Sequence, residues 1–204
     1  YDPDDPETAM LAKNIAAADS AGLQVLIHAI GREPNVAVLS AFEKVIAENG
    51  WRDRRFRIEH AAGVSSADLM RFSRSKIIPS MQPILFFDEA SGSGDDYRKM
   101  LDSGAALAFG ADAPMRGFDP LEGIYAAVNA GGKRALTVEE AVYAYTMGAA
   151  YAEFQEKEKG NIKVGRLADL VILSSDIFSE KADIRASTVW LTVANGRIVY
   201  ENTK

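Results

Sequence analysis

The chain has 204 residues and a formal net charge of −6, and 48% of its residues are hydrophobic while 25% are charged. This composition predicts a globular protein with one sizeable core and room for a small appendage. The acidic excess and the lack of a basic stripe argue against a nucleic-acid partner. The absence of cysteine excludes disulfides and thiolate metal sites. No apolar stretch approaches the roughly 18 residues that a membrane crossing needs, and no signal peptide is visible. We therefore expect a cytoplasmic protein that does not enter membranes, with an exported mature protein as the alternative.

Helical and strand patterns alternate over the first three quarters of the chain. The predicted elements are, in chain order, a helix over 5–22 capped by Asp5, a strand over 23–29 of the kind buried on both faces, a helix from Pro34 to Asn49, a strand over 55–61, a short helix capped by Ser65 or Ser66, a strand over 77–82, a helix over 96–103, a strand over 105–110, and helices over 119–130 and 137–154. The last helix begins with a capping box formed by Thr137 and Glu140. Alternating strands and helices favour βαβ crossovers and a parallel sheet.

Polar residues end these strands at regular intervals. His28, His60, Gln82 and Asp112 are separated by 32, 22 and 30 residues, and each interval fits one βα unit. Four such units are half of an eight-unit barrel, which usually takes about 250 residues when complete. We therefore expect an α/β fold with a partial (β/α)8 TIM-type barrel over residues 1–159.

The tail over residues 160–204 lacks helical periodicity and has the pattern of a small β unit. Strands are predicted over 170–173, 189–193 and 197–200, and Asn195-Gly196 forms a two-residue hairpin turn because both positions tolerate positive φ. A β unit of this size is too small to be stable alone. We expect it to dock on the barrel or to complete a larger sheet.

His28 and His60 are the only two histidines, and each ends an apolar run, which Asp112 also follows. Because the carboxyl ends of barrel strands meet at one mouth, the two imidazoles are placed to share one ion. Imidazole and carboxylate are both zinc ligands. Asp112 then serves as a third ligand, as the base that takes a proton from metal-bound water, or as both. The plainer alternatives are a packed histidine at each strand end and a turn at Asp112-Ala113-Pro114.

Three neighbouring features complete the candidate site. Glu59 precedes His60 in its strand and is therefore expected to point the opposite way, toward the helices, and to pair there with an arginine. Gln82 ends the third strand and is a candidate substrate contact. The apolar segment 83–87 predicts a loop above the site, which forms either a substrate wall or a cover over missing strands.

Several motifs, taken in order, resemble those of a known family. They are His28-Ala29-Ile30-Gly31, Arg57-Ile58-Glu59-His60-Ala61, Ser80-Met81-Gln82-Pro83 and Phe109-Gly110-Ala111-Asp112-Ala113-Pro114, followed by Gly160 to Val171 and Asn195 to Val199. This ordered set is similar to motifs of the amidohydrolase superfamily, and most to the branch that contains N-substituted formamide deformylase. The last two segments resemble the C-terminal β-sandwich of that superfamily and its terminal hairpin. The resemblance covers essentially the whole chain.

The resemblance implies a distorted (β/α)8 barrel, of which this chain holds strands five to eight, followed by a segment of a small β-sandwich. In that match His28 and His60 are the histidine ligands of strands five and six, and Asp112 is the aspartate of strand eight. The His-x-His pair that the family has on strand one, and its strand-four ligand, would precede Tyr1. The chain is therefore expected to be the C-terminal portion of a longer protein.

The resulting prediction is a metal-dependent hydrolase that acts on carbon–nitrogen bonds of amide-type small molecules, with zinc as the expected metal. Gln82 and Arg32 would bind substrate, and the family commonly has Asp where this chain has Arg32. The chain alone would bind metal weakly or not at all and have little or no activity. The alternative is a non-catalytic half-barrel module that associates with itself or with an N-terminal barrel half. A metal-independent aldolase or lyase ranks last, since no strand ends in lysine.

Overall fold

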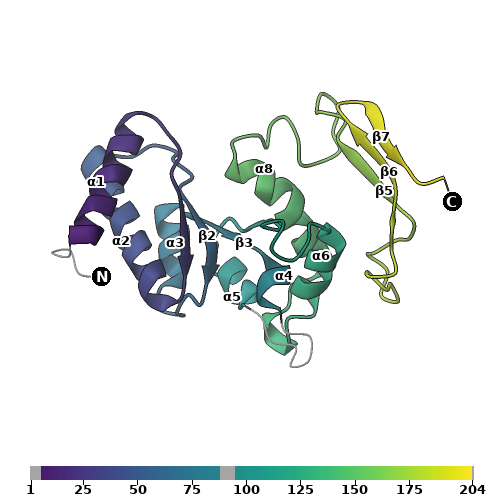
Figure 1. The fold of residues 1–204 in the computed structure, drawn as a ribbon, viewed down its shortest axis with the longest axis horizontal. Helices are drawn as coiled ribbons and strands as arrows, with labels where there is room; N and C mark the ends of the chain where they lie inside the picture. The colour runs from purple at the N-terminus through teal and green to yellow at the C-terminus, as the bar shows by residue number, and fades with distance from the viewer. Residues whose placement is uncertain (1–5, 88–94, 204) are drawn as a thin grey trace. The chain divides into compact units, whose positions relative to one another are not determined.

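Three parallel strands with helices packed beside them form the first of two structural units (Figure 1). The structure, a computed structural model, describes residues 6–87 and 95–203. The first unit comprises residues 1–81 and 95–108, and the remaining residues form the second unit. The expected helix cap Asp5 lies outside the described residues.

The first unit alternates helices and strands as its sequence pattern predicts. Its elements are α1 (Pro6–Ser20), β1 (Leu26–Ile30), α2 (Arg32–Asn49), β2 (Arg57–Ala62), α3 (Leu69–Ser75), β3 (Ile78–Met81) and α5 (Tyr97–Asp102), with β4 (Ala108–Phe109) after them. The strand order in the sheet is β1-β2-β3-β4, and the β1–β2 and β2–β3 pairs are parallel. The predicted α/β class and parallel sheet are therefore confirmed.

Two helix starts differ from the sequence prediction, and both differences have a local cause. Helix α2 begins at Arg32 rather than Pro34, because Gly31 takes a φ of 92° and its carbonyl accepts the amide hydrogen bond of Asn35. Helix α3 begins after Asp68 rather than after Ser65. The Ser65 hydroxyl instead donates to the Asp68 carboxylate at 2.5 Å, so it ties down the turn before the helix.

The strands of this unit have one covered face and one open face. Helices α1, α2 and α3 lie together on one side of β1 and β2 (Figure 1). Ala29 and Ile58 are fully buried, whereas Leu26 and Ile30 on β1 are each 44% exposed. The expectation that this strand is buried on both faces is therefore wrong for the described residues. An apolar strand face left open in this way lacks a covering layer.

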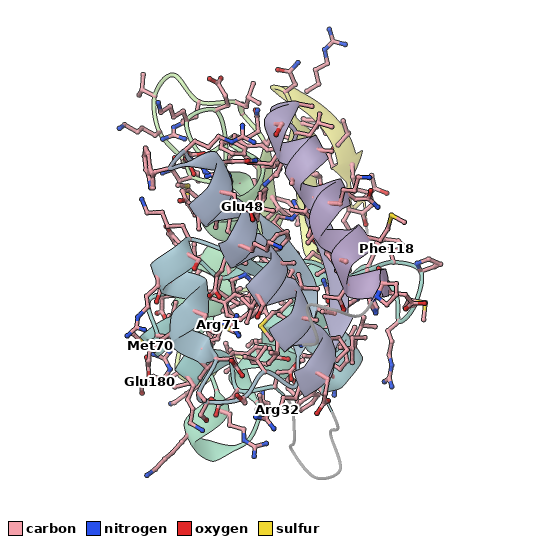
Figure 2. The ribbon with its side chains drawn as sticks, turned by 90° about the vertical axis from the view of Figure 1, so that its left-hand side faces the viewer. Arg32, Glu48, Met70, Arg71, Phe118 and Glu180 are labelled. Carbon is pink, nitrogen blue, oxygen red and sulfur yellow. The ribbon has the colours of Figure 1, made fainter. Side chains whose placement is uncertain are left out.

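The covered face carries the core of the first unit. Phe42 of α2 stacks on Phe56, which precedes β2, with ring centroids 4.5 Å apart. At the surface of the same layer, Arg71 of α3 reaches toward α2 (Figure 2), where its guanidinium donates to Glu43 at 2.7 Å and to Ser40 at 2.8 Å. Apolar packing and this ion pair together fix α3 against α2.

The second unit combines short helices with a separate antiparallel sheet. Its elements are α4 (Pro83–Phe86), α6 (Pro120–Val128), the 3-10 helix η1 (Gly132–Arg134), α7 (Val138–Tyr143), the π-helix η2 (Ala144–Gly148), α8 (Ala149–Ala152), β5 (Leu170–Leu173), β6 (Val189–Ala194) and β7 (Arg197–Glu201). The apolar segment expected as a loop over 83–87 is thus mostly the short helix α4. Pro83 explains this start, since its fixed φ suits the first helical position.

The helix predicted over 137–154 is interrupted by the π-helical turn η2. Its predicted start is confirmed, because Thr137 and Glu140 form the complete capping box. Single π-helical turns inside α-helices occur frequently at functional sites. Here the turn carries Tyr145, whose contacts are described below.

The tail forms a three-stranded antiparallel sheet in the order β5-β6-β7. Asn195 and Gly196 both have positive φ, at 49° and 74°, and make the predicted hairpin turn between β6 and β7. Apolar side chains such as Val171 and Ile198 remain more than half exposed on this sheet. None of the helices within residues 6–87 and 95–203 has both the length and the apolar composition that a membrane crossing requires.

Candidate functional site

The two histidines lie beside each other at the carboxyl ends of β1 and β2. Their ring centroids are 4.5 Å apart, and the ring planes meet edge to face at 77°. His28 is exposed on the open face of the sheet, whereas His60 is buried with 8% of its surface exposed. The two imidazoles are close enough to bind the same metal ion, and one of them can be reached from solvent.

Backbone geometry at His60 makes this approach possible. In the β1–β2 ladder, His28 stands opposite Glu59 and Ala29 opposite His60, so strand alternation alone would put the two imidazoles on opposite faces. The strand breaks this alternation, because His60 and Ala61 take left-handed φ values of 71° and 47°. A non-glycine residue in this region costs free energy, and such residues cluster at active sites and ligand clamps.

A buried asparagine ties the two strand ends together behind the histidines. Asn35 is 1% exposed, and its side-chain amide donates to the carbonyl of Gly31 at 2.8 Å and to that of Ala62 at 2.9 Å. The amide of Gly31 also donates to the Ala62 carbonyl at 2.9 Å. Sequence reasoning missed Asn35, although a polar residue on the buried face of a predicted helix is a recognisable signal.

Glu59 lies on the same face as His28, not toward the helices as predicted. Its carboxylate accepts from the Arg57 guanidinium and from the Ser80 hydroxyl, both within 2.8 Å. Ser80 is its neighbour in the β2–β3 ladder, so the three side chains share the open face. The predicted arginine partner is confirmed, whereas the predicted direction is wrong because alternation was counted from His60, where the strand geometry breaks.

Asp95 is a second acidic residue at this end of the sheet, and sequence reasoning missed it. One of its carboxylate oxygens accepts the amide of Gly63 at 3.3 Å, just beyond the end of β2. The other oxygen is buried and has no hydrogen-bond partner within the described part of the chain. Burial raises the pKa of Asp95 to about 6, although the Gly63 amide acts in the opposite direction. This carboxyl group can therefore hold or release a proton near neutral pH.

The other predicted site residues are placed as follows. Arg32 is exposed at the first position of α2, immediately after Gly31 (Figure 2). Gln82 and Asp112 belong to the second unit. Gln82 is 4% exposed and precedes α4. Asp112 is exposed with a φ of 52°, and its carbonyl accepts the amide of Met115 in the turn that the sequence predicts.

Tyr145 contacts residues 109 and 110, the segment that directly precedes the turn at Asp112. Its hydroxyl donates to the carbonyl of Gly110 at 3.4 Å, and its ring meets that of Phe109 edge to face, with centroids 5.4 Å apart. Burial raises the pKa of the Tyr145 hydroxyl, so it stays protonated and can keep this donor role. A Cβ at Gly123 of α6 would overlap this hydroxyl, which explains a glycine at that position.

The described residues do not form a complete metal shell. Within them, no group of three or more histidine, aspartate or glutamate side chains gathers closely enough to hold a metal ion. Catalytic zinc sites usually take three protein ligands. His28 and His60 have donor atoms of the right kind for two of these, and a metal ion held by them would need at least one further ligand.

Comparisons with known proteins identify the family of this chain. Residues 3–200 match the model of the amidohydrolase family. The chain is 34% identical to the Arabidopsis thaliana protein LONG AFTER FAR-RED 3 over 96% of its own length and 37% of that relative. It is 28% identical to N-substituted formamide deformylase of Arthrobacter pascens, over 91% of its own length and 38% of that enzyme. The chain belongs to the amidohydrolase family.

Solved structures show the same fold. An uncharacterised metal-dependent hydrolase from Pyrococcus furiosus superposes with a TM-score of 0.64 and 29% identity, over 78% of this chain and 35% of that one. Such neighbours are amidohydrolases with a TIM-barrel fold. The chain spans about two fifths of the length of the curated relatives named above. The formamide deformylase branch is one of several similar groups and is not singled out by these likenesses.

Proposed function

We propose that this chain is the C-terminal barrel half of a metal-dependent hydrolase that acts on carbon–nitrogen bonds of amide-type small molecules. The observation that carries the proposal is the imidazole pair of His28 and His60 at adjacent strand ends in a member of the amidohydrolase family. Residues 1–159 would supply barrel strands five to eight, and residues 160–204 a segment of the β-sandwich. Membership of the formamide deformylase branch is part of the proposal, as is a cytoplasmic location.

His28, His60 and Asp112 would hold the metal, together with ligands from an N-terminal barrel half. Two imidazoles and a carboxylate suit zinc best among common divalent metals. When bound, zinc acts as a Lewis acid and lowers the pKa of water toward 7. The edge-to-face approach of the two rings supports this assignment, because packing alone does not require a left-handed backbone at His60.

The remaining residues would move a proton and orient the substrate. The Asp112 carboxylate would accept a proton from attacking water and pass it to the leaving amine. Gln82 has a side-chain amide that both donates and accepts, which suits an amide substrate. Arg32 would donate to a carbonyl or carboxylate oxygen of the substrate from its exposed position at the start of α2.

A half-barrel needs a partner for the open face of β1. The 44% exposure of both Leu26 and Ile30 supports an association that covers this face, either with an N-terminal barrel half or with a second copy of the chain. The same feature supports the alternative function, a non-catalytic half-barrel module. The two functions differ in whether the histidine pair ever holds metal.

The deciding experiment measures bound zinc, solution mass and amide hydrolysis for the 204-residue chain and for a longer polypeptide that adds the N-terminal half. We expect stoichiometric zinc and turnover in the longer form, and weak zinc binding with self-association in the chain alone. His28→Ala or His60→Ala should remove zinc and activity from the longer form. Asp112→Asn should cut turnover by about 100-fold or more, while the exposed Asp102→Asn serves as the matched control. Zinc and activity that survive both histidine substitutions would contradict the proposal.

A further inference from the structure

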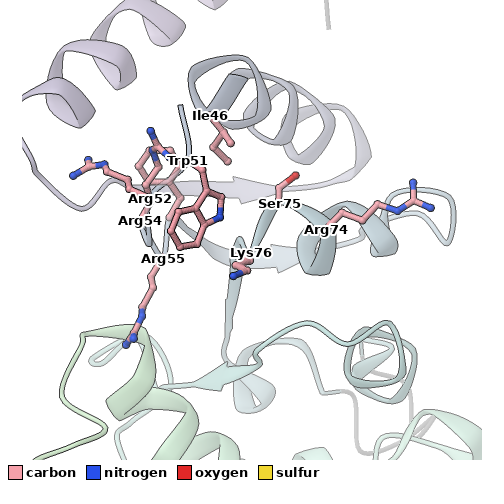
Figure 3. A pocket seen from close by; sticks show the side chains of 9 residues that line it. Ile46, Trp51, Arg52, Arg54, Arg55, Arg74, Ser75 and Lys76 are labelled. Carbon is pink, nitrogen blue, oxygen red and sulfur yellow. The ribbon is translucent and has the colours of Figure 1, made fainter. Parts of the chain in front are cut away.

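A basic pocket lies at the opposite end of the strands, before β2 and β3. Its wall comes from the loop at the start of β2, from the last turn of α3 and from α2 (Figure 3). The residues that matter for its chemistry are Trp51, Arg52, Arg54, Arg74 and Lys76. This pocket lies at the amino ends of the strands, whereas the histidine pair lies at the carboxyl ends of β1 and β2. The proposed hydrolase function does not involve the pocket.

One carboxylate is shared between two of these arginines. Asp19 of α1 accepts from the guanidinium groups of Arg52 and Arg54, and also from the side-chain amide of Asn49. Burial opposes ionisation of Asp19, yet the hydrogen bonds from Arg54, Asn49 and Arg52 lower its pKa to about 2. Asp19 is therefore always charged at neutral pH, and its single negative charge leaves one positive charge of the pair unbalanced.

Arg54 keeps one donor without a partner. Its side chain is 4% exposed, and its Nη1 atom is buried with no hydrogen-bond partner within the described residues. A buried donor left unsatisfied is unfavourable, and guanidinium groups bind oxyanions through paired N–H donors. Arg54 also lines a neighbouring hollow together with Asp19 and Arg52, so this cluster borders open space on two sides.

Two exposed cations complete the wall. Neither Arg74 nor Lys76 makes an ion pair within the described part of the chain, and the Lys76 ammonium lies 5.1 Å from the centre of the Trp51 ring. Glu43, which accepts from the Ser75 hydroxyl in the pocket wall at 3.4 Å, is paired with Arg71, and Asp53 is paired with Arg55. The pocket is thus positively charged in a chain whose formal net charge is −6.

We infer that this pocket binds a small oxyanion of the phosphate class, either inorganic phosphate or a phosphate monoester. The free donor of Arg54 and the unpaired Lys76 would contact the oxygens, whereas Arg74, whose guanidinium points away from Trp51 in Figure 3, would add positive charge nearby. Trp51 is 76% exposed at the rim and offers a flat apolar surface to the organic part of a monoester.

Trp51 provides a direct readout of this binding. The chain has two tryptophans, so Trp190→Phe leaves Trp51 as the only one. In that background we expect a saturable change in fluorescence when inorganic phosphate is added while sodium chloride keeps the ionic strength constant. Phenyl phosphate should bind more tightly than inorganic phosphate if the indole contacts the organic group, and equally if the site takes phosphate alone.

Charge-removing variants locate the site. Arg74→Ala and Lys76→Ala change exposed residues; Lys76→Ala should weaken phosphate binding by about three- to tenfold, and Arg74→Ala by about twofold, since Arg74 acts only through its charge. Lys99→Ala on α5 removes an equally exposed positive charge elsewhere and should leave the affinity unchanged. Calorimetry on the same variants checks the affinities without relying on tryptophan. A change that does not saturate, that sodium chloride reproduces, or that Lys99→Ala weakens as much as Lys76→Ala would overturn the inference.

Discussion

The two ends of the parallel sheet in the first unit differ in the polar side chains that they carry and in how fully these are hydrogen-bonded. At the carboxyl ends of β1 and β2, two imidazoles meet, and Asn35 connects the strand ends by donating to two carbonyls. At the amino end, charged groups dominate, with Asp19 saturated by Arg52, Arg54 and Asn49.

This difference separates a candidate metal-binding site from the Asp19 carboxylate, which connects α1 to Asn49 and to the two arginines before β2. The carboxyl end has a left-handed backbone at His60 and an unpartnered oxygen on Asp95. Both features are unfavourable in the folded chain, and a bound ligand would offset part of their cost. The carboxylate at the amino end has every oxygen engaged. If this distinction is correct, substitution of Asp19 should mainly change stability, whereas substitutions beside the histidine pair should mainly change function.

The largest effect is expected from Asp19→Asn at the amino end. This change leaves Arg52 and the buried Arg54 without a counter-charge, which should destabilise the fold by about 3–5 kcal/mol. Urea unfolding at pH 7 measures this loss, with the exposed Glu48→Gln on α2 as the control, because its ion pair with Lys44 is worth little.

The pH dependence of the same cluster gives an independent check. The folded-state pKa of Asp19, about 2, is below its ordinary value of 3.8. Its contribution is therefore fully present above pH of about 4 and is lost as the pH falls through about 2. Asp19→Asn should remove this part of the acid dependence. An unchanged unfolding profile between these pH values would show that the cluster does not carry the stability assigned to it.

A smaller effect on stability, joined to a loss of function, is expected from Asn35→Ala at the carboxyl end. Removing its amide leaves the carbonyls of Gly31 and Ala62 with one donor fewer, at a cost of about 1–3 kcal/mol. Because these carbonyls flank the histidine pair, zinc affinity of the longer polypeptide should also fall. Asn129→Ala is the matched control, since Asn129 makes a similar side-chain to backbone bond on the surface. Equal zinc affinities in the two variants would contradict a positioning role for Asn35.

Most of the fold could be predicted from the sequence because it follows local periodicity. The strands around His28 and His60, the capping box at Thr137 and the turn at Asn195 all depend on residues close together in the chain. The π-helical turn that carries Tyr145 could not be predicted, because it depends on tertiary packing rather than on a sequence period.

Only those residues of the candidate site that directly follow a predicted strand could be predicted from the sequence. His28 and His60 were found because parallel strands bring their carboxyl ends together. The direction of Glu59 was missed, since alternation counted from His60 fails where that residue adopts positive φ. Asp95 was missed because it lies 32 residues from Gly63, the residue whose amide it accepts, and no spacing rule joins them.

The smallest effect is expected at Asp95, and it tests directly whether an unsatisfied group at the carboxyl end lowers the stability of the folded chain. Burial raises its pKa from 3.8 to about 6, so the folded state binds its proton more tightly than the unfolded state does. Stability should therefore fall as the pH rises from about 4 to about 6, by about 1–2 kcal/mol after allowance for solvent screening. Asp95→Asn should abolish this fall and make the chain more stable at pH 7, whereas Asp102→Asn, at an exposed position on α5, should not. If Asp95→Asn instead destabilises the chain at pH 7, the carboxylate is satisfied in the folded state and the carboxyl end resembles the amino end more than the structure indicates.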